Sequence, residues 1–92
     1  MKTYLITYDL MRPGQNYSTL IEAIKEIGAW YHCLASTWLV NTTLSAEEIR
    51  DLLKPPIIDT TDKLLVVRLH GEWACWFPKE AMQWLHDNMS AE

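Results

Sequence analysis

The chain has 92 residues and a formal net charge of −4 at pH 7, with 49% hydrophobic and 22% charged residues. This length predicts one small domain with a single core, so a binding site is expected in a surface groove or an interface. The acidic charge disfavours a protein that binds nucleic acid mainly through its phosphates. Five Trp and four Tyr are many aromatic residues for so small a domain, which favours oligomerisation.

The cysteines and the hydropathy pattern bear on the cellular setting. Cys33 and Cys75 form no C-x-x-C motif, and no signal-peptide pattern begins the sequence. Reduced thiols and a cytoplasmic location are therefore expected. No apolar run approaches the ~18 residues of a membrane span, so no membrane partner is expected.

The N-terminal segment predicts a strand that ends in a carboxylate. Residues 3–8 are all β-branched, aromatic or aliphatic, which is typical of a strand buried on at least one face. Asp9 ends this strand at a loop with a Pro13-Gly14 turn signal. An aspartate in this position either caps the turn or faces a site at the end of the sheet.

A helix is expected over residues 17–27, with Asn16 as its N-terminal cap. Its apolar residues recur at helical spacing, and Gly28 stands where a C-terminal cap belongs. Residues 29–42 are rich in aromatic and β-branched residues, which predicts two short strands with a break near Ala35-Ser36.

The next helix has a clear start signal. Ser45 and Glu48 fit a capping box, in which each side chain satisfies the backbone N–H group of the other residue. The helix is expected to run to about Leu53, with Ile49, Leu52 and Leu53 on its apolar face.

Residues 63–70 predict a strand with apolar residues on both of its faces. We expect one alternating set to face the helices and the other to face the open side of the sheet. The first set is Leu65, Val67 and Leu69, and the second is Leu64, Val66, Arg68 and His70.

The C-terminal segment predicts two further elements. Residues 72–77 are expected to form a short edge strand, and Pro78 begins a helix that runs to about Asn88. The whole order predicts one α+β domain over residues 1–92, a ferredoxin-like βαββαβ sandwich with an extra C-terminal short strand and helix. Its core is expected over about 1–70 and the addition over 71–92.

One face of such a sheet stays open within a single chain. This half-apolar face predicts either sheet-to-sheet dimerisation or cover by the C-terminal segment. Its expected members are Leu5, Thr7, Asp9, Leu64, Val66 and Arg68.

The order of elements and a few residues resemble a known family. The features are Tyr8-Asp9 at the end of the first strand, the segment Leu34–Val40 with Ser36 near its break, the helix start at Ser45–Glu48, and Asp62 ahead of Leu64–Val67. Over roughly residues 1–69 the chain resembles the small CRISPR-associated protein that partners the spacer integrase, and the virulence-associated protein D toxins look similar.

The resemblance implies a ferredoxin-like fold and a symmetric homodimer. It also implies that Asp9 of each protomer is catalytic and holds a shared divalent metal, Mg²⁺ or Mn²⁺, for cleavage of RNA or DNA phosphodiesters. Such a metal would position a water molecule and neutralise charge on the phosphoryl group.

Other residues are candidates for binding. Tyr8, Arg12, Asn16 and Tyr17 surround the loop after Asp9 and are expected to bind a phosphate or stack on a base. For Tyr8 and Tyr17 the alternative is a position in the core or at its rim, and this alternative is favoured for Tyr8. Trp73 and Trp76 are expected at a dimer interface.

Two functions follow. The first is a dimeric, metal-dependent nuclease with Asp9 at the symmetry axis, which the resemblance favours. The alternative is a non-catalytic interaction protein on the same scaffold, which binds a partner protein or a small nucleotide. The acidic charge and the hydrophobic loop residues Leu10, Met11 and Pro13 favour this alternative. Nucleic acid is a possible partner that the acidic charge disfavours.

Overall fold

The computed structural model describes residues 1–9, 17–54, 62–74, 76 and 79–89. Within these residues the chain is α+β, with a four-stranded antiparallel sheet in the order β2-β3-β1-β4. This architecture is compatible with the expected ferredoxin-like class. In chain order the elements are β1 (Lys2–Asp9), α1 (Tyr17–Lys25), β2 (Ala29–Leu34), β3 (Thr37–Thr42), α2 (Ala46–Leu53), β4 (Lys63–Leu69) and α3 (Lys79–Asn88).

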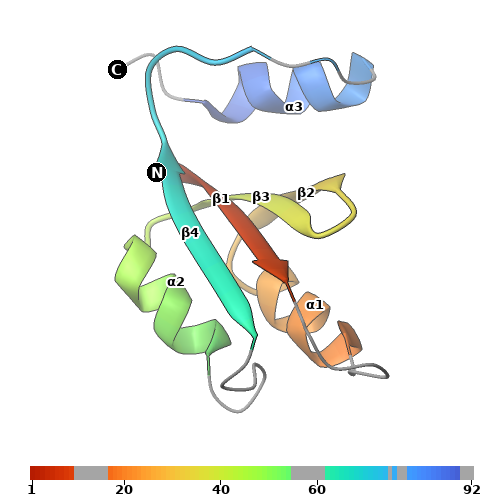
Figure 1. Ribbon diagram of the computed structural model, residues 1–92. Coiled ribbons are helices and arrows are strands. Elements are labelled where there is room, and N and C mark those ends of the chain that lie inside the picture. The colour runs from red at the N-terminus through yellow and green to blue at the C-terminus, as the bar shows by residue number, and fades with distance from the viewer. Residues whose placement is uncertain (10–16, 55–61, 75, 77–78, 90–92) are drawn as a thin grey trace.

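The helices lie on both sides of the sheet (Figure 1). α1 and α2 pack against one face, which we call the helix face, and α3 crosses the end of the sheet near the N-terminus of the chain. The core on the helix face consists of Tyr4, Ile6 and Tyr8 of β1, Trp38 and Val40 of β3, Leu20 and Ile24 of α1, and Ile49 and Leu53 of α2.

Two signals in the local sequence are confirmed. The Ser45 backbone N–H donates to Glu48 Oε1 at 2.9 Å, and the Glu48 N–H donates to Ser45 Oγ at 3.1 Å, so the capping box at the start of α2 is complete. The break at Ala35-Ser36 separates β2 from β3.

The expected orientation of β4 is wrong. Val66 lies opposite Ile6, and Leu64 lies opposite Tyr8. Cross-strand partners point to the same face of a sheet, so Leu64 and Val66 join the core on the helix face. Leu65 and Val67 face the other side instead.

Arg68 is also misplaced by the sequence-based prediction. It lies opposite Tyr4, which is buried in the core, so Arg68 belongs to the helix face and not to the face that carries Asp9.

Three smaller expectations are corrected at the ends of elements. α1 ends at Lys25, and among the described residues only Gly71 has a positive φ, so Gly28 is not a left-handed helix cap. Leu52 is 55% exposed and lies outside the apolar face of α2. Residues 72–74 and 76 form no strand, whereas the helix predicted after them is present as α3.

Candidate functional site

The sheet face opposite α1 and α2 is the candidate site, and we call it the open face. The strand register arranges its side chains in rows that cross the sheet. From the α3 end these rows are Ala29, Asn41, Thr3 and Leu69; then Tyr31, Leu39, Leu5 and Val67; then Leu34, Thr37, Thr7 and Leu65; and last Asp9 and Lys63.

α3 covers the first end of the open face. The backbone carbonyl of Asn88, at the C-terminal end of α3, accepts hydrogen bonds from Thr3 Oγ1 at 2.6 Å and from Asn41 Nδ2 at 3.2 Å. Asn41 Nδ2 also donates to Thr3 Oγ1 at 3.0 Å. Apolar packing accompanies this network, because Leu85 of α3 is buried. The expected cover by the C-terminal segment is thus confirmed for this end.

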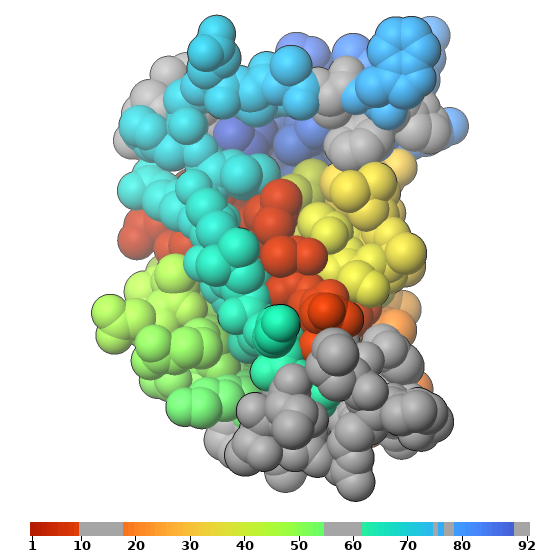
Figure 2. Space-filling model, in the orientation of Figure 1, coloured from red at the N-terminus to blue at the C-terminus, as the bar shows by residue number. Residues whose placement is uncertain are grey.

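Beyond this end the open face is only partly covered: Leu39 is buried, whereas other side chains stay exposed, and Figure 2 shows the β1 side chains (red) between β4 (teal) and the β2–β3 strands (yellow). Leu65 and Val67 on β4 are 55% and 40% exposed, and Leu34 at the end of β2 is 55% exposed. We call these three residues the exposed apolar patch. Leu65 and Val67 lie at one edge of the sheet and Leu34 at the other, with Thr37 and Thr7 between Leu34 and Leu65. Exposed apolar side chains on one face of a sheet are typical of a site that another molecule covers.

An apolar pocket lies where the covered and exposed parts of the open face meet. It has a volume of about 230 Å³. Its walls come from the sheet and from the C-terminal segment, and they include Leu5, Leu34, Leu39, Leu69, Trp73 and Leu85. A concave site with such walls suits an apolar group of modest size.

The two tryptophans expected at an interface differ in their surroundings. Trp73 lines the pocket and makes an edge-to-face contact with His86 of α3, with ring centroids 5.4 Å apart. Trp76 is 99% exposed. Trp73 therefore makes contacts within the chain, whereas the side chain of Trp76 is exposed to solvent.

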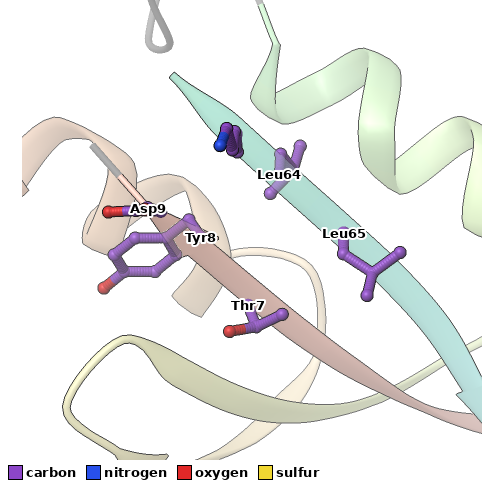
Figure 3. Close-up of a pocket in the computed structure, with 6 residues that line it drawn as sticks. Thr7, Tyr8, Asp9, Leu64 and Leu65 are labelled. Atoms are coloured by element: carbon purple, nitrogen blue, oxygen red, sulfur yellow. The ribbon is translucent and has the colours of Figure 1, made fainter. Parts of the chain in front are cut away.

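Asp9 lies at the end of the open face that is far from α3. It is exposed, ends β1 and lies opposite Lys63 of β4. A second, shallow pocket of about 160 Å³ is lined by residues from both strands around this point. In Figure 3 the Asp9 carboxyl group is directed away from Leu64 and Leu65 of β4.

The residues beside Asp9 are held by the sheet and the core. Tyr8 is only 6% exposed, and its hydroxyl accepts a hydrogen bond from Trp38 Nε1 at 3.3 Å, which confirms the core position for this tyrosine. Thr7 Oγ1 donates to the Ser36 carbonyl at 3.2 Å. These contacts fix the backbone that carries Asp9.

The other loop candidates are not placed by the structure. Arg12 and Asn16 lie outside the described residues. Tyr17 is the first residue of α1, but its side chain is not described. Among the described residues, no group of three or more His, Cys, Asp or Glu side chains is arranged to hold a metal ion.

Trp30, His32 and Trp38 of β2 and β3 form an aromatic cluster on the helix face, beside the core. His32 stacks on Trp38 with ring centroids 4.1 Å apart, and Trp30 contacts the same indole at 5.3 Å. Lys25 Nζ lies 4.9 Å above the Trp30 ring. Through these contacts Trp30 and Trp38 pack within the chain.

Comparison of the chain with protein-family models, with curated proteins and with solved structures finds no match. In the part of the chain that the structure describes, no helix is both long enough and apolar enough to cross a membrane.

Proposed function

We propose that this chain is a ferredoxin-like interaction protein that binds a partner protein through the exposed part of its open face. The antiparallel sheet order β2-β3-β1-β4, with α1 and α2 on one face, supports the ferredoxin-like assignment. We also propose a cytoplasmic setting, because Cys33 and Cys75 lack the spacing of a disulfide framework.

The observation that carries this proposal is the gathering of exposed apolar side chains beside an apolar pocket. Leu34, Leu65 and Val67 belong to neighbouring rows of the open face. Leu34 also lines the pocket, and Val67 lies opposite Leu5, another residue of the pocket wall, so the exposed side chains flank the pocket from the two edges of the sheet. The net charge of −4 makes a protein a better partner for this surface than a polyanion.

A double substitution at the patch tests this function. Leu65→Glu with Val67→Glu places two carboxylates on the open face of β4, where the folded chain tolerates them because the side chains are 55% and 40% exposed. Leu52→Glu is the matched control, since Leu52 is 55% exposed on α2. We expect the wild type and the control to capture the same partner from an extract of the source cells, and the double variant to lose it.

Circular dichroism of all three proteins would establish that the folds are equal. The proposal fails if the double variant is folded and still captures the partner as well as the wild type does.

A second candidate function is metal-dependent cleavage of a phosphodiester by a homodimer. The exposed position of Asp9 on the open face favours it, because a two-fold axis close to Asp9 would bring two Asp9 carboxylates together. Mg²⁺ prefers six oxygen ligands and usually takes one or two carboxylates with water and substrate phosphates, so each protomer would supply one carboxylate. The resemblance to the small CRISPR-associated protein points the same way.

Asp9→Asn tests this second function, because it keeps the size of the side chain and removes the charge that holds the metal. RNA and DNA would be incubated with wild type and variant, with and without Mg²⁺ or Mn²⁺. Metal-dependent cleavage by the wild type that the variant lacks would support the nuclease. Equal behaviour of both proteins on every substrate would exclude Asp9 as the metal ligand.

A further inference from the structure

We propose that the partner of the open face is a second copy of this chain, and that each copy inserts its Trp76 indole into the apolar pocket of the other. This inference rests on the proposed function, since it names the occupant of the surface described above.

Trp76 is set apart by its exposure. Its side chain is 99% exposed, whereas Trp38 is 2% exposed and Trp30 is 41% exposed beneath Lys25. A tryptophan side chain buries about 150–250 Å² of surface when it is packed, so an indole in water leaves a large apolar area uncovered. Tryptophan is also the residue type most enriched among the anchors of protein interfaces.

The pocket matches an indole in size and chemistry. An apolar cavity of about 150 Å³ accommodates benzene, and this pocket, at about 230 Å³, is larger. The hydroxyl of Thr37 on its wall already shares a hydrogen bond of 3.0 Å with Thr7 Oγ1. The Thr37 hydroxyl therefore needs no hydrogen bond from a group that enters the pocket, and the apolar walls suit an aromatic ring.

The pocket and the indole are neighbours on one chain. Ala74 lines the pocket, and Trp76 follows only two residues later. A two-fold interface brings the same surface of both copies together, so it needs the inserted group and its pocket to lie on that one surface. Reciprocal insertion would also cover Leu34, which lines the pocket and is 55% exposed.

The charges of the open face permit contact between two copies. The chain as a whole is acidic, with a net charge of −4. On the rows of the open face, the charged side chains are Asp9 and Lys63, which are opposite in sign and lie opposite each other in the register. The strand rows thus carry no net charge, and like-charge repulsion between these rows of two copies is small.

Sedimentation velocity over a concentration series tests the reciprocal insertion of Trp76, which we call the exchange. We expect the wild type to dimerise and Trp76→Ala to weaken the dimer at least about tenfold in dissociation constant, as loss of a buried aromatic anchor does. Leu34→Asp should weaken it to a similar degree, because it places a carboxylate in the wall of the pocket. Trp76→Phe should keep part of the affinity, and Leu52→Ala, on the far side of the sheet, should keep all of it.

The outcomes separate this inference from the proposed function. A wild type that stays monomeric at every concentration, or a dimer that Trp76→Ala leaves unchanged, overturns the exchange of Trp76. If the dimer resists Trp76→Ala but is lost in the variant with Leu65→Glu and Val67→Glu, the exchange is wrong and the open face remains the binding surface. Capture of a different protein by a monomeric wild type also overturns the exchange and leaves the proposed function in place.

Discussion

Gly28 occupies a position where the sheet leaves no room for a side chain. A Cβ atom built on Gly28 would overlap the backbone carbonyl of Asn41 on β3 and lie 3.3 Å from Thr42 Cβ. The residue therefore allows the turn after α1 to pass close to β3. This is a requirement for space, since the φ angle of Gly28 is not positive.

Gly28→Ala should destabilise the protein. The added methyl group must displace the backbone of β3, and overpacking of this kind typically costs about 1–3 kcal/mol. Urea denaturation followed by tryptophan fluorescence would measure the loss. Glu26→Ala, at an exposed position nearby, is the control and should change the free energy of unfolding by less than about 0.5 kcal/mol. If the two variants are equally stable, the backbone of β3 moves aside at no cost in free energy, and Gly28 is not required for space.

Single residues also show where sequence interpretation reached its limit. The capping box at Ser45 was predictable because both of its partners lie within one turn of helix. The orientation of β4 was not, because Leu64 and Leu65, like Val66 and Val67, are equally apolar. Only the pairing of Val66 with Ile6, sixty residues earlier in the chain, decides which set enters the core.

At the scale of elements, α2 is a helix with a strong local start. Its eight residues make it too short to be stable alone in water. The capping box supplies partners for two backbone N–H groups, and Ile49 and Leu53 anchor the helix in the core.

Ser45→Ala should lower the free energy of unfolding by about 0.5–2 kcal/mol, because it removes the acceptor for the Glu48 N–H group. Thermal unfolding would measure this, and Ser45→Asp should restore most of the loss, since aspartate is also a strong N-terminal cap. The account of the cap is wrong if alanine and aspartate behave alike.

α3 is held on the open face by a small number of specific contacts. The carbonyl of Asn88 receives hydrogen bonds from Thr3 and Asn41, which come from two different strands of the sheet. The sequence predicted this helix. It also predicted that either the C-terminal segment or a second copy of the chain covers the open face. It could not reveal the contacts, because they join residues 85 and 47 positions apart.

Asn41→Leu should loosen α3. The substitution removes one donor to the Asn88 carbonyl, which keeps its hydrogen bond from Thr3, and loss of such a hydrogen bond costs about 0.5–1.5 kcal/mol. Faster amide hydrogen exchange in α3, with β1 and β3 unchanged, would reveal it. Gln83→Ala removes only an exposed contact within α3 and should leave exchange nearly as in the wild type.

At the scale of the whole molecule, the two faces of the sheet have different roles. The helix face builds the core with α1 and α2. The open face is covered at one end by α3 and leaves apolar side chains exposed over the rest. The sequence predicted Asp9 at the end of its strand and on the open face, but it placed Leu64 and Val66 there in error and missed Leu65 and Val67. The roles of Arg12, Asn16 and Tyr17 stay predictions.

The central claim is that the exposed part of the open face is the surface where another protein binds. Side-chain footprinting with hydroxyl radicals tests it most directly, by comparing the dilute protein with the same protein bound to its partner. We predict protection of Leu34, Leu65 and Val67 in the bound state, with Leu52 on the helix side as reactive as before. Protection of Leu52 while Leu65 and Val67 keep their full reactivity would contradict the account.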